Sequence, residues 1–278
     1  MNRFTGFSMQ SLNGLLFGIC LLSGLGFTAE SNVISQPHSK ASLVSELDRV
    51  APGSSFYIGL NLKLENHWHV YWKNPGDSGM APHIDWVLPD GVEADGVVWP
   101  RPEKIPVAPL LNYGYHDEVL LPVKISVSES YVAKSLNIQG LASWLVCKEV
   151  CIPGNAELEL TLEVGERSSS QRKADLEAAL ALAPQKLKLM RGTISEQGDS
   201  LAIELYAAKP IFAGAQKVEV FVADANLIEY AAPSSARWKN NYLNLSHPKA
   251  ATFYKLPTAV SGVFVVDDVT AWEFVVSH

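Results

Sequence analysis

Ala156-Glu-Leu-Glu-Leu-Thr-Leu-Glu-Val164 decides the fold class, because apolar and polar side chains alternate along it without a break. A period of two places alternate side chains on opposite faces of a β-strand, one in a core and one in water. Two earlier stretches, 55–64 and 119–127, have the same signature. Residues 41–165 therefore predict an antiparallel β-sandwich. Its turns are signalled by Asn74-Pro-Gly-Asp77, Pro89-Asp-Gly91 and Gly140.

The alternation returns in the last third of the chain. Five further stretches have the strand signature, namely 200–206, 217–222, 242–245, 262–266 and 271–276. They predict a second β-sandwich over residues 185–278. Residues 166–184 lack the alternation, and within them residues 174–183 favour a helix that Pro184 ends. The sequence therefore predicts an all-β protein of two sandwiches joined by a short helical linker.

The N-terminal residues have the layout of a secretory signal peptide. An apolar stretch, residues 12–27, follows Arg3 and ends before the polar residues that begin at Glu30. This predicts a signal peptide over residues 1–29 and a mature chain in an oxidising compartment. No later apolar run approaches the ~18 residues that span a bilayer, so we expect the mature chain to be soluble. The net charge of −7 and the lack of a basic patch argue against nucleic-acid binding.

The two cysteines beyond the signal peptide lie just before the first quoted stretch, in Trp144-Leu-Val-Cys147-Lys-Glu-Val-Cys151-Ile-Pro153. A disulfide needs Cα atoms within roughly 7 Å, whereas four residues of extended strand cover about 13 Å. The chain must therefore turn at residues 148–150. A loop this small adds only about 2 kcal/mol of stability by the chain-entropy estimate, which favours a reversible thiol pair over a staple. A structural disulfide and a metal site remain open alternatives.

A second group of candidate residues lies in His67-Trp-His-Val-Tyr-Trp-Lys-Asn-Pro-Gly-Asp-Ser-Gly79. Strand alternation divides its first six residues between two faces: His67, His69 and Tyr71 on one, and Trp68, Val70 and Trp72 on the other. The polar face is either an ordinary solvated strand face or a surface under the cysteine turn. In the second case its rings, together with Lys148 on the turn, would influence the thiolate. Two histidines and two cysteines also leave a copper(I) or zinc site open.

Four motifs together resemble the N-terminal periplasmic domain of the DsbD family of thiol:disulfide interchange proteins, in its ScsB-like branch. The match covers nearly the whole mature chain and is much more specific in the first half. The motifs are residues 67–79, Trp99-Pro-Arg-Pro-Glu-Lys-Ile-Pro106, Asn112-Tyr-Gly-Tyr115 leading into Leu120-Leu-Pro-Val123, and residues 144–153.

The resemblance implies an immunoglobulin-like fold and a redox role for Cys147 and Cys151. In such a role the pair takes electrons from a membrane-embedded thiol electron carrier and passes them to thioredoxin-fold periplasmic oxidoreductases, with no cofactor and no metal. Supporting positions fall on His69, Tyr71, Tyr113 and Tyr115. The loop 107–112 matches the family's cap over the disulfide, but Ala108-Pro-Leu-Leu111 lacks the aromatic and acidic residues of that cap.

Two functional hypotheses follow. Members of the family usually continue into a membrane domain and a thioredoxin-like domain, whereas this sequence stops at His278. The first hypothesis is a soluble redox relay, part of a split reductase, in the context of cytochrome c biogenesis or copper tolerance. The second is a shortened relative that works as a non-catalytic binding module with a permanent disulfide, with copper as a candidate ligand.

Overall fold

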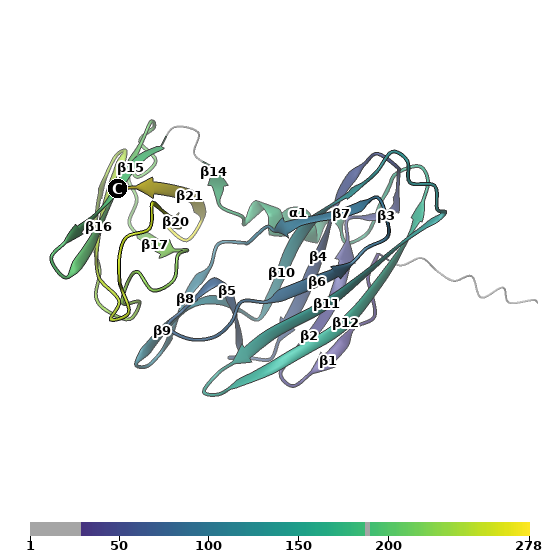
Figure 1. The fold of residues 1–278 in the computed structure, drawn as a ribbon, viewed down its shortest axis with the longest axis horizontal. Helices are drawn as coiled ribbons and strands as arrows, with labels where there is room; N and C mark the ends of the chain where they lie inside the picture. The colour runs from purple at the N-terminus through teal and green to yellow at the C-terminus, as the bar shows by residue number, and fades with distance from the viewer. Residues whose placement is uncertain (1–28, 187–189) are drawn as a thin grey trace, which may run out of the picture.

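The computed structural model describes residues 29–186 and 190–278 of the chain, as two lobes built of β-strands (Figure 1). The signal peptide predicted for residues 1–29, with Cys20, therefore lies outside the described residues apart from its last position. Within the described ranges, no helix is long and apolar enough to cross a membrane.

The larger lobe is a sandwich of two sheets, which we call the first sandwich. One sheet has the order β1 (Ile34–Gln36), β2 (Ser39–Ser45), β4 (Ser55–Leu64), β10 (Glu118–Val127) and β7 (Val92–Val97). The other has the order β13 (Ser168–Ser169), β3 (Leu47–Val50), β12 (Cys151–Val164), β11 (Ser135–Cys147), β5 (His69–Gly76), β9 (Leu110–His116) and β8 (Glu103–Val107), and β6 (His83–Val87) pairs with β11.

The alternation that predicted these strands is visible in their burial. Along β12, Ala156, Leu158, Leu160 and Leu162 are buried, and the glutamates between them are exposed. Each of the three leucines contributes roughly 1.5–3 kcal/mol when fully buried. Strand β12 pairs with β11 in unbroken antiparallel register from Ser135–Glu163 down to the two cysteines. The predicted all-β sandwich is confirmed.

Two local predictions are wrong. Gly140 does not mark a turn, because it lies in the middle of β11, opposite Trp86 of β6. A Cβ atom there would stand 2.7 Å from Ile84, so glycine makes room for the neighbouring strand. His67 does not share a strand face with His69 either. His67 has φ of 70° and lies in the turn before β5, and the strand itself begins at His69.

The predicted helical linker is present as α1, Lys173–Ala181, the only α-helix in the described residues. It packs on β10 and β4, with Leu176 fully buried. Gly59 of β4 permits this approach, because a Cβ atom there would lie 3.1 Å from the Leu176 side chain. The helix thereby covers the outer face of one sheet of the first sandwich.

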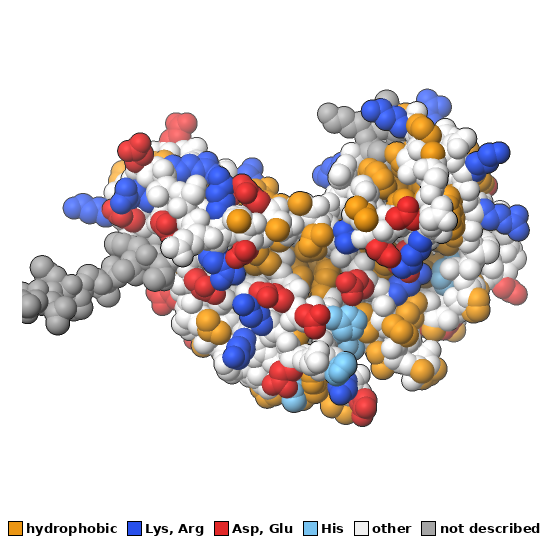
Figure 2. All heavy atoms as spheres, turned by 180° about the vertical axis from the view of Figure 1, so that it is seen from behind, with side chains coloured by type: hydrophobic (Ala, Val, Ile, Leu, Met, Phe, Trp, Pro, Cys, Tyr) orange, Lys and Arg blue, Asp and Glu red, His pale blue; other side chains and the backbone are white. Residues whose placement is uncertain are grey.

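The second sandwich is built on one hydrogen-bonded sheet. Its order is β17 (Val218–Val222), β20 (Ala259–Val266), β21 (Thr270–Ser277), β15 (Met190–Gln197), β16 (Ser200–Ala207), β19 (Tyr242–Pro248) and β18 (Ser235–Lys239), and β14 (Gln185–Lys186) pairs with β21. All five strands expected in this part of the sequence are present. The molecular surface is hollowed between the two sandwiches, and hydrophobic side chains gather there (Figure 2).

The two sandwiches meet through four aromatic side chains, Trp72, Tyr113, Phe221 and Tyr230, which we call the interdomain cluster. The Tyr113 ring lies 5.0 Å from that of Phe221 and 5.3 Å from that of Tyr230, both edge to face. The Trp72 ring lies 6.4 Å from Phe221. Such geometries add about 0.5–1.5 kcal/mol per pair beyond area burial. The two halves therefore share one continuous apolar core.

Asn74 of β5 fastens the same junction with hydrogen bonds. Its Nδ2 atom donates to the carbonyl oxygen of Val222 at 2.7 Å and to the hydroxyl oxygen of Tyr230 at 2.8 Å. Its Oδ1 atom accepts from the backbone N–H of Gly76 at 3.1 Å, which shapes the bulge at the end of β5. A single buried amide thus joins the first sandwich to the second.

We expect Asn74→Ala to lower the free energy of unfolding by about 2–4 kcal/mol, because it leaves the Val222 carbonyl and the Tyr230 hydroxyl buried without this partner. Urea unfolding of the full chain, followed by tryptophan fluorescence, measures the change. Asn137→Ala is the matched control, since the exposed Asn137 amide donates only to Glu159. Equal stabilities of the two variants would contradict the assigned role of Asn74.

Candidate functional site

The turn between β11 and β12 brings Cys147 and Cys151 together as a disulfide. Their Sγ atoms are 2.08 Å apart and their Cα atoms 4.2 Å apart. The two residues are also the last register pair of the hairpin, so the bond crosses the strands where the hairpin closes. Residues 148–150 form the turn predicted from the spacing, with the N–H of Lys148 donating to the carbonyl oxygen of Val150.

The two cysteines differ sharply in exposure. Cys147 is 2% exposed, whereas Cys151 is an exposed residue. The turn residues Lys148, Glu149 and Val150 are exposed as well. An incoming thiolate therefore reaches the Sγ atom of Cys151 more readily than that of Cys147. Since exchange proceeds by attack on one sulfur with departure of the other, Cys147 is the leaving group in such a reaction.

Four residues from four adjacent strands form one line across the sheet, which we call the cysteine–histidine row. Cys151 of β12 is paired with Cys147 of β11, Cys147 with His69 of β5, and His69 with His116 of β9. Directly opposed residues of neighbouring strands project to the same face of a sheet. The row therefore places two imidazoles on the same face as the disulfide, on the side of the buried cysteine.

His69 is neutral at ordinary pH. It is 2% exposed, and burial, with a smaller contribution from the charge of His116, lowers its pKa to about 4. Within the described residues its Nε2 atom has no hydrogen-bond partner. The His116 ring lies 5.9 Å away, and its Nδ1 atom is 3.3 Å from the Glu103 carboxylate.

Tyr71 contacts the disulfide directly. Its hydroxyl oxygen lies 3.5 Å from the Sγ atom of Cys151, and the hydroxyl donates because a disulfide sulfur carries no proton. Its ring meets that of His69 edge to face at 5.3 Å. Burial raises the pKa of Tyr71, and the nearby Ser78 side chain opposes the shift. The hydroxyl therefore stays protonated and available to the sulfur.

Gly79 packs on the Tyr71 ring and keeps it in place. A Cβ atom at Gly79 would lie 2.1 Å from Cζ of Tyr71, and the residue has φ of 101°, a conformation that favours glycine. We call residues 76–79 the Tyr71 cover. Within this cover, Ser78 donates from both its backbone N–H and its hydroxyl to Oδ1 of the buried Asn112, each at 3.1 Å. The cover thus links the disulfide region to β9.

The loop 107–112, expected to cap the disulfide, contains the turn of the β8–β9 hairpin. In the structure this hairpin holds the Tyr71 cover. The N–H of Leu111 donates to the Asp77 carboxylate at 2.8 Å, and the N–H of Asp77 donates to the Leu111 carbonyl at 3.1 Å. The hairpin is therefore connected to Cys151 through the cover and Tyr71.

The remaining predicted site residues have separate positions. Tyr113 belongs to the interdomain cluster, where burial raises its pKa far above the usual value. Tyr115 donates a hydrogen bond to the carbonyl oxygen of Pro100, and burial raises its pKa as well. Lys148 lies exposed on the cysteine turn. Of the five supporting residues, the structure brings His69, Tyr71 and Lys148 to the cysteines, and it gives the two other tyrosines structural contacts.

The sequence reasoning missed His116, Gly79 and Asn74. Gly79 and Asn74 lie inside the quoted stretch 67–79, and His116 directly follows the Asn112–Tyr115 motif. A prediction of which strands are neighbours would have been needed to find His116. In the described part of the chain, no three His, Cys, Asp or Glu side chains gather in a way that could hold a metal ion.

A β-sandwich with an exposed cysteine joined to a buried one at a hairpin turn offers one sulfur to an attacking thiolate. Residues 40–163 match the family model of the thiol:disulfide interchange protein DsbD, N-terminal, so this part of the chain is similar to that domain.

The fold of the whole chain is similar to a solved structure, the N-terminal periplasmic domain of ScsB from Proteus mirabilis. The TM-score is 0.68 at 19% identity, over 90% of this chain and 99% of that chain. A conserved domain protein from Bacillus anthracis also matches over 89% of this chain and 91% of its own, at 10% identity, but with a TM-score of 0.26 it carries no argument. The search of curated proteins found no match.

Proposed function

We propose that this chain is a periplasmic thiol–disulfide exchange protein. It takes reducing equivalents from a membrane-embedded thiol electron carrier and passes them to thioredoxin-fold partners through Cys147 and Cys151. The observation that carries this proposal is the unequal exposure of the two cysteines within a domain similar to the N-terminal domain of DsbD. The periplasmic location is supported by the ScsB domain that shares the fold.

The reaction follows from the geometry of the site. A thiolate of the electron donor attacks Sγ of Cys151, the bond to Cys147 breaks, and Cys147 leaves with the electron pair. A second thiol of the donor then attacks the mixed disulfide and releases Cys151, which leaves the pair reduced. Transfer to a partner disulfide is the reverse sequence, with Cys151 as the attacking thiolate. The Tyr71 hydroxyl, 3.5 Å from Cys151 Sγ, is placed to stabilise negative charge on that sulfur.

The experiment that tests this function is a redox titration of the mature chain in graded glutathione buffers, followed by thiol alkylation and mass measurement. We expect a midpoint between about −120 and −270 mV, the range of thioredoxin-fold oxidoreductases and their relatives. A pair that stays oxidised below about −300 mV is a structural staple, and the exchange function would then be wrong.

A further inference from the structure

Release of Cys147 as a leaving group creates an electrostatic problem. The residue is 2% exposed, and burial disfavours a charged sulfur, as it raises the pKa of buried thiols generally. The exposed Lys148 side chain lies on the turn, among solvated groups, where its charge is largely screened. A proton delivered to Cys147 as the S–S bond breaks would remove the cost of the buried charge.

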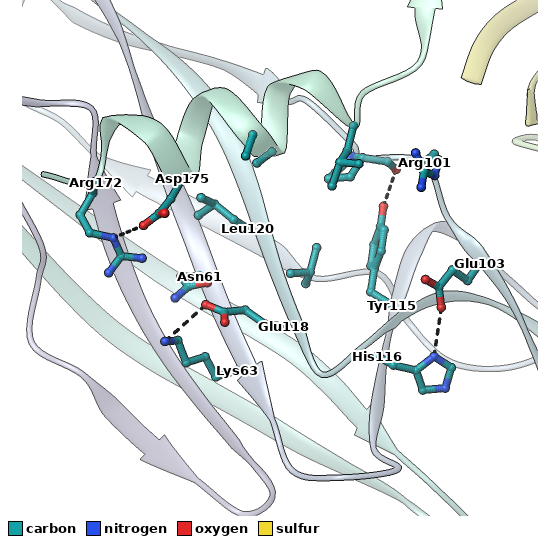
Figure 3. Close-up of a pocket in the computed structure, with 15 residues that line it drawn as sticks. Asn61, Lys63, Arg101, Glu103, Tyr115, His116, Glu118, Leu120, Arg172 and Asp175 are labelled. Atoms are coloured by element: carbon teal, nitrogen blue, oxygen red, sulfur yellow. Dashed lines mark hydrogen bonds and ion pairs between the residues drawn. The ribbon is translucent and has the colours of Figure 1, made fainter. Parts of the chain in front are cut away.

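The cysteine–histidine row connects Cys147 with the molecular surface. His69 is directly opposite Cys147 and has an unpartnered, buried Nε2 atom. His116, the next residue in the row, has a ring 5.9 Å from that of His69 and a side chain that is 38% exposed. Both His116 and Glu103 line a groove of about 750 Å³ between helix α1, strand β10 and residues 100–103 (Figure 3).

We propose that His69 and His116 form a proton relay between this groove and the buried sulfur of Cys147. The proposal rests on the exchange function proposed above and adds a path for the proton of the leaving thiolate. In the relay, His69 lies next to the leaving sulfur, and His116 passes protons between His69 and the groove. Glu103 orients the His116 ring through the contact of its carboxylate with Nδ1, at 3.3 Å.

Charge and atoms balance along this path. The attacking dithiol, as its thiolate, forms a bond to Cys151 Sγ, and the electron pair of the broken S–S bond moves to Cys147 Sγ. One proton enters at His116, is handed to His69 and ends on Cys147, which becomes a neutral thiol. When the reduced pair attacks a partner disulfide, the proton of Cys147 leaves by the same route. The second thiol of the dithiol then attacks the mixed disulfide and releases Cys151, so the net reaction is reduction of the protein disulfide and oxidation of the attacking dithiol.

The titratable groups that face His69 determine when its imidazole takes up a proton. They are Tyr71 on its own strand, His116 on β9 and Cys147 on β11, and Glu103 of β8 contacts His116 in turn. Burial and the charge of His116 keep His69 unprotonated while the disulfide is intact. A thiolate at Cys147 acts in the opposite direction, because a nearby anion favours the charged imidazole. Cleavage of the disulfide therefore favours transfer of a proton from His116 to His69, next to Cys147.

The test measures reduction of the full mature chain by dithiothreitol from pH 5 to pH 9. The substitution is His116→Gln, because His116 is part-exposed and the variant is expected to fold. The matched control is His83→Gln, which also removes an exposed histidine paired with a carboxylate, Asp85 at 3.0 Å. Division of each variant rate by the wild-type rate at the same pH cancels the ionisation of the attacking reagent.

We expect His116→Gln to slow reduction at least about tenfold below pH 7 and to converge on the wild-type rate at high pH, where proton delivery is of less importance. His83→Gln should match wild type throughout. In His116→Ala, added imidazole should enter the groove and restore part of the rate, which a purely structural role would not allow.

A flat ratio for His116→Gln, equal to that of His83→Gln, would overturn the relay while leaving the exchange function intact. A wild-type pair that dithiothreitol cannot reduce at any pH would overturn both. The glutathione titration of the wild-type chain separates these two results, since it reports on the exchange function alone.

Discussion

The variant Cys147→Ser is expected to form a stable mixed disulfide, whereas Cys151→Ser is expected to form almost none. The reason is that Cys147→Ser leaves the exposed cysteine free and removes the thiol that would resolve the adduct, while Cys151→Ser leaves only a buried thiol. We expect reaction with a small aromatic disulfide reagent to be about 100-fold faster for Cys147→Ser at pH 7.5. Release of the coloured thiolate measures both rates.

The same asymmetry extends to protein partners. With a thioredoxin-fold protein that lacks its own resolving cysteine, Cys147→Ser should yield a covalent complex on a non-reducing gel, and Cys151→Ser should not. The double variant, with both cysteines replaced by serine, controls for non-covalent association. If the two single variants react at the same rate, the assignment of Cys151 as the attacked sulfur is wrong.

Substitution of Gly79 by alanine is expected to increase access to the Cys151 sulfur further, by moving Tyr71 away from it. The new Cβ atom would lie 2.1 Å from Cζ of Tyr71, so the ring must move or the Tyr71 cover must lift from it. Either change breaks the contact between the Tyr71 hydroxyl and Cys151. We expect dithiothreitol to reduce the disulfide roughly tenfold faster, with a loss of about 1–3 kcal/mol of stability because φ is positive. Alkylation time courses and urea unfolding measure the two effects.

Gly198→Ala is the matched control for that prediction. Gly198 also has positive φ, at 60°, but a Cβ atom there meets nothing within 4 Å. It should therefore lose some stability without any change in the reduction rate. If Gly79→Ala and Gly198→Ala give the same reduction rate, Tyr71 does not shield the disulfide.

The strands could be predicted from the sequence because burial on one face imposes a period of two. Residues 55–64 were expected as a strand, and β4 has the same limits. The helix expected at residues 174–183 begins one residue earlier and ends two residues earlier, at Lys173–Ala181. The turn at residues 148–150 followed from the length of the chain between two sulfurs. These predictions succeeded because each depends on neighbours in the sequence.

The cysteine–histidine row was beyond such reasoning. His69 and His116 are 47 residues apart in the sequence, and they meet because β5 pairs with β9 in one particular register. Alternation alone also extended β5 to His67, because it cannot detect a change of backbone direction. His67 has a left-handed conformation, and β5 begins two residues later than predicted, at His69.

The contact between the sandwiches was likewise invisible in the pattern. Trp72 and Tyr113 have the periodicity of ordinary core residues, and the exposed fraction of each is 1% or less. Part of what buries them is the second sandwich, through Phe221. An apolar residue at the predicted phase indicates that a side chain is covered, but gives no information about which part of the chain covers it.

The interdomain cluster couples the folding of the first sandwich to that of the second. Trp72 and Tyr113 cannot be fully desolvated until Phe221 has arrived, and Phe221 in turn completes its surroundings on these two rings. The two sandwiches are therefore coupled in their unfolding equilibrium, and denaturant sensitivity should scale with the surface of the whole chain. A truncation that removed the second sandwich would take Phe221 away from Trp72 and Tyr113, and the rest of the protein would then carry an exposed aromatic patch.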